Sequence, residues 1–427
     1  MRRSMNILYI VPFWPYIYTS YLFQEVAWMR QRGHHAALIS TGDSPGPHAD
    51  LAPSGLTDVP TLQIRTAYRG DAALHKELVG LGPLGVWGRA GPGLRQRMGE
   101  RGCRQGLHEW LATRRAVRFA RRQGTQVIEA HWATKPAEIA CDIHLATRIP
   151  FAVRLHGGDL YRSPSPLLPR TVEHASALCP VSQFLLTLLT GKRPVPELPE
   201  VPKLDLDLRK IRVCHNGILA SMIADQPAQQ NEQTIMVGSI GRLDPEKRHS
   251  DLIEAIAPLL ALHPGLRLRL IGGGVLETPL RDLIRRLGIA DRVEITGTQP
   301  WATVMELART LHIYVQTSSV EACSLATVEG QSRGVPMLLS RTGAAEQCVE
   351  EGRNGHLFDT GDVPTLTRCL RHLIEVGPER RRRMGAVSLE IVRQRFCFER
   401  QMELKESILQ ACLAGQPLPD DPSMGNT

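Results

Sequence analysis

Residues 241–247 follow a short apolar run and place two cations across a glycine turn. Arg242 and Lys247 are five positions apart, and Gly241 leaves room for a ligand to approach the backbone. Both cations can converge on one diphosphate, arginine as a planar fork and lysine as a point charge. The alternative is an ordinary loop in which both side chains are solvated. The seven residues alone leave both interpretations open.

A second pattern places two carboxylates after another apolar run. Glu321 and Glu329 are separated by seven residues, the first in a loop and the second in the helix predicted to follow. Each carboxylate can accept hydrogen bonds from a pair of sugar or ribose hydroxyls, and the backbone N–H groups of residues 323–326 at the helix start would favour a phosphate. Alternatively, Glu321 caps the helix and Glu329 is solvated. Taken by itself, the pair favours this structural role.

Two glycine-rich turns also follow predicted strands. His156 precedes Gly157 and Gly158, so its side chain could donate to a sugar hydroxyl or a carbonyl at the strand tip; the alternative is a core or surface histidine with no role. Residues 272–274 are three glycines that lack the GxGxxG spacing of dinucleotide sites. We interpret them as a tight turn near a nucleotide whose diphosphate Arg242 and Lys247 would bind.

The elements that position these residues alternate along the chain. Short apolar runs predict strands and segments with a 3.6-residue period predict helices, a succession typical of parallel sheets in doubly wound α/β folds. Predicted strands cover residues 7–11, 36–39, 127–129, 151–155, 177–180, 211–214, 234–240, 266–271, 293–296, 313–317 and 337–340. Predicted helices between them include 21–31, 136–147, 248–262, 276–287, 301–309 and 326–333.

A chain of 427 residues with 42% hydrophobic and 22% charged residues fits two globular domains rather than a small stapled scaffold or a disordered chain. We expect a first Rossmann-like domain over 1–220, a polar linker over 221–233 and a second over 234–395. A helix over 396–415 would return to the first domain, and 416–427 would be a disordered tail.

Charge and cysteines bear on partners and compartment. The net charge is +8, and from Arg89 to Arg122 there are ten arginines against Glu100 and Glu109. This stretch follows an apolar, glycine-rich segment, so it predicts either peripheral contact with an anionic membrane or a merely solvated helical face. Nine scattered cysteines without metal-site spacing indicate reduced thiols. We therefore expect a cytoplasmic protein, peripheral at the inner face of the cell membrane if the basic stretch binds lipid.

The motifs in this order resemble the family-four retaining glycosyltransferases, which have the GT-B fold of two Rossmann-like domains facing each other across a cleft. The resemblance extends from Asn6 to about Leu373. Its G-R-L-x-x-x-K signature matches Gly241, Arg242, Leu243 and Lys247, its E-x7-E signature matches Glu321 and Glu329, and its later glycine pattern is similar to residues 334–346.

The resemblance implies roles for individual residues. His156, Arg242, Lys247 and Glu321 would be catalytic, with the two cations stabilising the departing nucleoside diphosphate. The donor would contact Gly241, Arg242, Lys247, Gly273, Thr298, Ser324, Leu325 and Glu329. Residues 18–26 resemble the start of exopolysaccharide and colanic-acid-type transferases, which would place Tyr18, Thr19 and Ser20 on the acceptor side. Asp159, in the His156-Gly157-x-Asp159 tip that resembles the first-domain histidine motif of the family, is expected on the same side.

The implied reaction moves a sugar from a nucleotide sugar to a hydroxyl of a saccharide or lipid-linked saccharide acceptor, with retention at the anomeric carbon. Because arginine and lysine would replace a divalent metal beside the diphosphate, we expect no metal and no cofactor. Alternatives are a sugar-nucleotide epimerase or a phosphorylase on the same fold, and a non-catalytic scaffold that binds polyanions through the basic stretch. Nucleic acid is not the expected partner.

Overall fold

The computed structural model describes residues 3–14, 20–42, 56, 58–64, 103–161, 164–191, 204–229 and 233–420. These residues form two units. Unit 1 contains the described residues of Met1–Pro180, Thr187–Val213 and Leu404–Asp421, and unit 2 contains those of Val181–Leu186 and Cys214–Glu403. The main division falls between Val213 and Cys214, ahead of the linker expected at 221–233.

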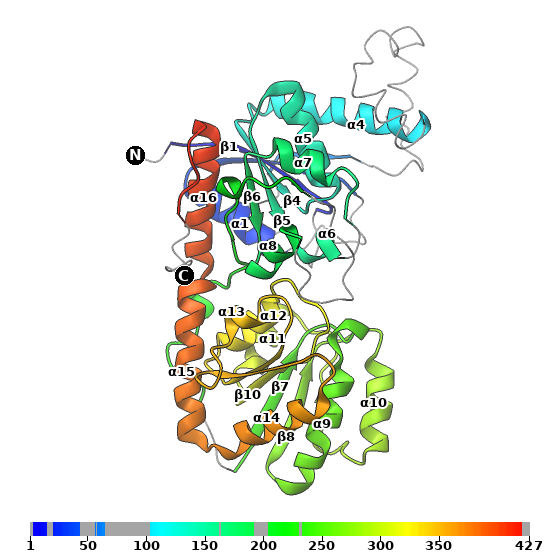
Figure 1. The fold of residues 1–427 in the computed structure, drawn as a ribbon, viewed down its shortest axis with the longest axis vertical. Helices are drawn as coiled ribbons and strands as arrows, with labels where there is room; N and C mark the ends of the chain where they lie inside the picture. Colours follow the sequence, from blue (N-terminus) through cyan, green and yellow to red (C-terminus); the bar gives the residue numbers. More distant parts are fainter. Residues whose placement is uncertain are drawn as a thin grey trace. The chain divides into compact units, whose positions relative to one another are not determined.

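The first half of the chain is a parallel sheet with helices in its crossovers (Figure 1). Its strands have the order β3-β2-β1-β4-β5-β6, the arrangement of the Rossmann fold. The elements are β1 (Asn6–Val11), α1 (Ser20–Gln31), β2 (His35–Ser40), β3 (Thr61–Gln63), α4 (Cys103–Arg122), β4 (Val127–His131), α5 (Lys135–Thr147), β5 (Phe151–Leu155), α6 (Gly157–Tyr161), α7 (Leu168–His174), β6 (Ala177–Pro180) and α8 (Gln183–Leu189).

Unit 2 repeats this arrangement with the order β12-β11-β10-β7-β8-β9, again all parallel. The elements are β7 (Ile235–Ile240), α9 (His249–Leu262), β8 (Leu266–Ile271), α10 (Glu277–Arg286), β9 (Val293–Ile295), α11 (Trp301–Ala308), β10 (Ile313–Gln316), α12 (Leu325–Gln331), β11 (Met337–Ser340), α13 (Ala345–Cys348), β12 (Gly355–Phe358), α14 (Val363–Glu375) and α15 (Pro378–Arg395). Two Rossmann-like units, as expected from the sequence, are therefore confirmed.

The core of unit 2 explains why its strands read as continuous apolar runs. Helices α9, α10 and α14 cover one face of the sheet, and their apolar side chains pack with those of β7, β8, β10 and β11. Helices α11 and α12 contact the sheet through β7 and β10. Strands covered by helices on both faces have no solvent-facing side to make polar.

Three sequence predictions differ from the structure. Residues 211–214 are not a strand, because Ile211 makes only an isolated bridge to Leu178. Strands β3 and β12 were not predicted. Both are short and lie at sheet edges, where half-exposed sequences such as Thr61–Gln63 carry little apolar signal.

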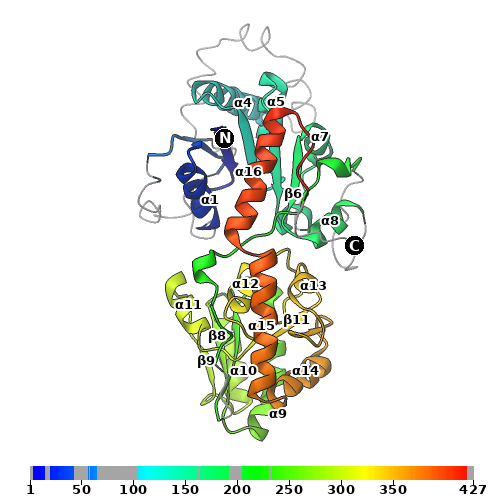
Figure 2. The same ribbon diagram turned by 90° about the vertical axis from the view of Figure 1, so that its left-hand side faces the viewer.

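The C-terminal helix α16 (Phe398–Ala414) begins in unit 2, and the chain enters unit 1 from Leu404 onward. Within unit 1, α16 is drawn in red near α1 in Figure 2, and Lys405 and Glu406 contact residues of α1 and of the turn that follows it. Across the described residues, no helix has both the length and the apolar character needed to cross a bilayer.

Candidate functional site

Most of the residues singled out in the second half lie at one edge of the unit 2 sheet. Strands β10, β7, β8 and β9 are successive neighbours in a parallel sheet, so their carboxyl ends meet at the same edge. The turns that follow them contain residues 241–247, 272–274, 297–298 and 317–321. Ligands of such folds bind at this edge.

The turns after β7 and β10 are held together by backbone and side-chain hydrogen bonds. Ser319 donates its backbone N–H to the Glu246 carbonyl at 2.8 Å, and the Thr317 hydroxyl donates to the Lys247 carbonyl at 2.8 Å. The two sequence motifs therefore share one loop cluster, although Lys247 and Thr317 are 70 positions apart in the sequence.

Lys247 and Glu321 contact each other directly within this cluster. The Lys247 ammonium forms an ion pair with the Glu321 carboxylate, and both side chains are largely buried. The Ser318 hydroxyl donates to the same carboxylate oxygen at 2.9 Å. Glu321 therefore does not cap the following helix, as the alternative from the sequence had it; the Ser324 hydroxyl does so by accepting from the Thr327 N–H at 3.2 Å.

Arg242 occupies a more open position than Lys247. Its side chain is 51% exposed and forms ion pairs with Asp244 and, at 3.2 Å, with Glu246. The guanidinium is therefore accessible from solvent. Its ion pairs with Asp244 and Glu246 fix its position.

The glycines after β8 allow two turns to approach each other. Gly272 has a φ of +144°, and a Cβ there would lie 2.0 Å from the carbonyl oxygen of Gly241. A Cβ on Gly273 would lie 2.6 Å from the Thr298 hydroxyl. The structure thus brings Gly241, Gly273 and Thr298 together, and side chains at positions 272 and 273 would separate the turns.

Glu329 has a partner that the sequence analysis missed. The indole N–H of Trp301, the first residue of α11, donates to Glu329 Oε1 at 2.7 Å. Burial raises the pKa of Glu329 to about 7, against the opposing effects of this hydrogen bond and of the Arg333 charge. Glu329 is thus a partly buried carboxyl with a hydrogen-bond donor, rather than a fully solvated one.

In unit 1, His156 lies at the carboxyl end of β5, as predicted. Its imidazole stacks on Trp132, with ring centroids 4.4 Å apart, and its Nε2 is buried without a hydrogen-bond partner among the described residues. Burial, followed by the charges of His131 and Arg154, holds its pKa well below the usual 6.5. His156 is therefore a neutral imidazole with one unused nitrogen.

Asp159 joins two strand-end turns of unit 1. Its Oδ2 accepts the backbone N–H groups of His156 at 2.7 Å and of Ala133 at 2.9 Å. Trp132, between β4 and Ala133, has a φ of +73°, a conformation that a large side chain rarely adopts. No sequence pattern marked Trp132, because backbone strain and ring stacking leave no spacing signal.

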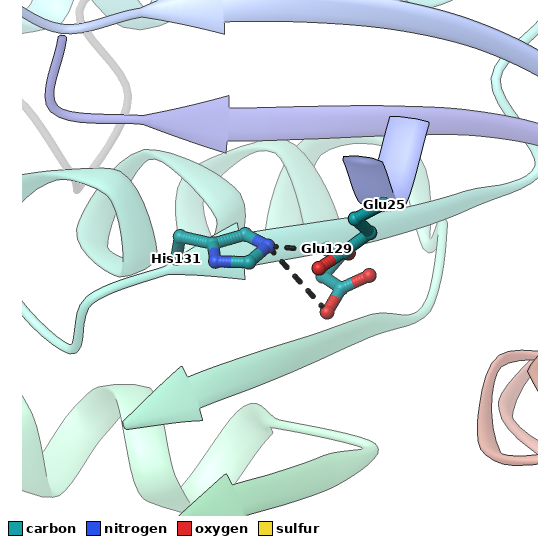
Figure 3. Close-up of side chains that lie close together, drawn as sticks. All are labelled: Glu25, Glu129 and His131. Atoms are coloured by element: carbon teal, nitrogen blue, oxygen red, sulfur yellow. Dashed lines mark hydrogen bonds and ion pairs between the residues drawn. The ribbon is translucent and has the colours of Figure 1, made fainter. Parts of the chain in front are cut away.

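A buried cluster of ionisable groups lies beside His156 in unit 1 (Figure 3). His131 Nε2 is 3.4 Å from Glu25 Oε1 and 3.7 Å from Glu129 Oε1. One ligand atom from each of the three residues lies within 4.8 Å of the others, a spacing that could hold a metal ion. The ring of His131 also stacks on that of His156 at 5.9 Å.

Lys405 of α16 supplies the positive charge for this cluster. Its Nζ is 2.5 Å from Glu25 Oε2 and 2.8 Å from Glu129 Oε1, and all three side chains are 3% exposed. Despite burial, Lys405 and His131 hold the pKa of Glu25 well below its usual range. Burial and the charge of Glu25 raise the pKa of Glu129 to about 7, and burial lowers that of His131 to about 4. A cation would compete with an ammonium already in contact with both carboxylates, so these residues fit a metal poorly.

Several predicted residues fall elsewhere. Tyr18 and Thr19 lie outside the described residues, as does the side chain of Ser20, whose backbone begins α1. The first part of the basic stretch, up to residue 102, also lies outside them. Asp205 and Asp207 form an Asp-x-Asp sequence, and in the structure Asp207 forms an ion pair with Arg209.

The chain is similar to known proteins in sequence and in fold. Residues 223–388 match a protein-family model described as "Glycosyl transferases group 1". A D-inositol 3-phosphate glycosyltransferase of Thermobifida fusca is 34% identical over 167 residues, which are 37% of this chain and 38% of that protein. An N-acetyl-alpha-D-glucosaminyl L-malate synthase of Bacillus anthracis is 24% identical over 68% of this chain and 75% of its own length.

A solved structure extends the fold similarity to almost the whole chain. The crystal structure of Anabaena HepE in complex with UDP and glucose superimposes with a TM-score of 0.67 at 19% identity, over 96% of this chain and 100% of that one. At this identity the superposition shows the fold alone. The second unit therefore carries the sequence pattern of glycosyl transferases group 1, and the chain has the GT-B fold of two Rossmann-like units.

Proposed function

We propose that this protein is a retaining glycosyltransferase that moves a sugar from a nucleoside diphosphate sugar to an acceptor hydroxyl. One observation supports it above the others. Arg242, Lys247 and Glu321 lie in neighbouring turns at one edge of the unit 2 sheet, and Glu329 lies in α12, the helix that follows. All four residues belong to the segment that matches glycosyl transferases group 1.

In the proposed mechanism, the ammonium of Lys247 and the guanidinium of Arg242 bind the diphosphate and stabilise the negative charge that grows on it as the glycosidic bond breaks. Glu321 holds Lys247 in place and accepts hydrogen bonds from the donor sugar, while Glu329 accepts from the ribose. The leaving phosphate takes the acceptor's proton, so no side-chain nucleophile is needed. Because the two cations neutralise the diphosphate, we propose that the reaction needs no divalent metal.

We propose that unit 1 contributes His156 and binds the acceptor. A neutral imidazole with a free buried nitrogen can exchange one hydrogen bond with a sugar hydroxyl. Resemblance of residues 18–26 to exopolysaccharide transferases supports a saccharide or lipid-linked saccharide acceptor in cell-surface glycan synthesis. Replacing His156 by alanine should then lower kcat by about 10²-fold while leaving the nucleotide Kd unchanged.

The basic stretch would bring the enzyme to a lipid-linked acceptor. Its described part is α4, where the Arg114 guanidinium lies 4.8 Å from the centre of the Trp110 ring. Sedimentation with vesicles tests this proposal: binding to anionic vesicles that is lost at 0.5 M salt supports it, and equal binding to zwitterionic vesicles contradicts it.

A thermal-shift screen against UDP, GDP, ADP and their sugar conjugates, with and without EDTA, tests the donor site. A nucleotide at about 100 times its Kd should add about 2.7 kcal/mol and raise the melting temperature by a few degrees. The shift should survive EDTA and vanish in Arg242→Ala. The matched control is Arg285→Ala, which removes an exposed arginine of α10 paired with Asp282.

Product analysis separates the competing functions. Transfer to an added acceptor with the anomeric configuration of the donor kept, seen by NMR, supports a retaining transferase. Conversion of the nucleotide sugar without an acceptor indicates an epimerase. If no nucleotide shifts the wild-type protein, the donor site is wrong and the polyanion-binding scaffold becomes the better proposal.

A further inference from the structure

Trp301 is an unusual residue for the open edge of a sheet. It begins α11, immediately after Pro300, and its side chain is 43% exposed although it is a large apolar group. The exposed apolar area costs free energy in the free protein, so a ligand that covers it would gain from its burial.

The indole is anchored at one point. Its N–H donates to Glu329 Oε1 at 2.7 Å, which fixes both the ring and the carboxylate. Glu329 lies in α12, whose start is capped by the Ser324 hydroxyl accepting from the Thr327 N–H, so the carboxylate is held on an ordered element. One oxygen of Glu329 is thereby occupied, and the other remains for a further donor.

The indole of Trp301 and the carboxylate of Glu329 suit the two parts of a nucleoside, its base and its ribose. A ribose presents neighbouring hydroxyls that can donate hydrogen bonds to a carboxylate oxygen. The base attached to that ribose has a flat π face, and an exposed indole is a strong stacking surface for any base. The stacking surface of Trp301 and the carboxylate of Glu329 are joined directly by a hydrogen bond.

We propose that Trp301 is the nucleoside-positioning residue of this chain, whose N–H holds Glu329 for the ribose and whose exposed ring stacks on the base of the donor. This rests on the proposed function and adds a residue that lies outside both signatures. Because stacking tolerates every base, Trp301 strengthens nucleotide binding without choosing the base.

Two substitutions separate the contributions. Trp301→Phe keeps an aromatic face and removes the N–H, and should weaken binding of the nucleoside diphosphate by roughly 2- to 10-fold. Trp301→Leu removes both and should weaken it by roughly 5- to 150-fold, with inorganic pyrophosphate binding unchanged. The matched control is Trp28→Phe in α1 of unit 1, where the indole lies beside Arg32.

Intrinsic fluorescence gives a readout that a merely structural role would not move. The chain has six tryptophans, so the nucleotide should change the emission of the wild type and of Trp28→Phe, but not that of Trp301→Phe. If Trp301→Leu has a lowered melting temperature, the nucleotide Kd of Trp301→Phe still tests the inference. Nucleotide binding with unchanged Kd in both Trp301 variants would overturn the inference and leave the proposed function standing. Failure of the wild type to bind any nucleotide would overturn both.

Discussion

Lys405 and Glu129 form a buried ion pair at 2.8 Å, although 276 positions separate them in the sequence. Glu129 lies in β4, near the middle of the unit 1 sheet, and Lys405 lies in α16. The same ammonium contacts Glu25 of α1, so Lys405, together with the charge of Arg154, compensates two carboxylates that have lost their hydration. Removing the charge from such a cluster leaves the remaining carboxylates uncompensated.

We expect Lys405→Met to destabilise unit 1 by about 3–5 kcal/mol at pH 7.5. Methionine fills a similar volume, so the loss would come from the charge rather than from a cavity. Urea denaturation followed by far-UV circular dichroism measures the change. In the double variant Lys405→Met, Glu129→Gln, one of the two uncompensated charges is absent, and part of the stability should return. A loss below 1 kcal/mol in the single variant would show that the lysine is dispensable.

The carboxyl of Asp159 should make stability fall as the pH rises. Burial raises its pKa to about 7, against two backbone hydrogen bonds that lower it, while its unfolded pKa is near 3.8. Because the folded state binds the proton more tightly, the stability that this group contributes is present below pH 4 and is lost as the pH rises through 7.

Asp159→Asn removes that dependence, since the amide oxygen can still accept from His156 and Ala133. The variant should gain stability relative to wild type between pH 5 and pH 8.5, by at most about 4 kcal/mol. Denaturant midpoints at both pH values measure it. A difference between variant and wild type that does not vary with pH would contradict the assignment.

Nucleotide binding should weaken as the pH falls below 7, because Glu329 then takes up a proton and accepts hydrogen bonds from the ribose less well. Burial raises its pKa to about 7, and the neighbouring groups are Trp301 of α11, Arg333 after α12 and Tyr314 of β10. Isothermal titration between pH 5.5 and 8.5 should show this decline in the wild type. Glu329→Gln should bind weakly with a flat profile, and an equally steep profile in that variant would assign the proton elsewhere.

Gly272→Ala should disrupt the loops at the sheet edge. The added Cβ would lie 2.0 Å from the Gly241 carbonyl oxygen, and that contact is with backbone that cannot rotate away. We expect a loss of about 3 kcal/mol or more and no measurable nucleotide binding. Gly288→Ala is the control: its φ is +69°, but nothing lies within 4 Å, so it should cost only about 1 kcal/mol. Equal effects of the two changes would mean that conformation alone, not the close approach, requires the glycine.

The unit 2 sheet was largely predictable, because helices on both faces make each strand a short continuous apolar run bounded by turns. That the candidate residues Arg242, Lys247 and Glu321 lie near one another was predictable as well, since they follow strands whose order brings their ends together. Strand β12 escaped prediction because the edge sequence Gly355–Phe358 is only partly buried.

The residues whose roles were not predicted contact partners that are distant in the sequence. Trp301 reaches Glu329 across 28 positions, and Lys405 reaches Glu25 across 380. Neither partner can be read from a local pattern, because lysine and tryptophan at such positions are ordinary helix residues. Segment 211–214 was wrongly predicted as a strand because its β-branched residues favour extended structure. In the structure only Ile211 pairs, through an isolated bridge to Leu178 of the edge strand β6.

The passage of α16 into unit 1 has a consequence for the order in which the protein is made. A ribosome releases Glu25 and Glu129 before it begins unit 2, but Lys405 only after all of β7–α15 has been synthesised. Until then the nascent first unit lacks the helix that carries the lysine, so burying both carboxylates would cost free energy that their pairing with Lys405 otherwise offsets. Unit 1 can therefore be completed only after unit 2 has been synthesised, and a ribosome that stalls within unit 2 leaves an incomplete first unit that chaperones and proteases can recognise.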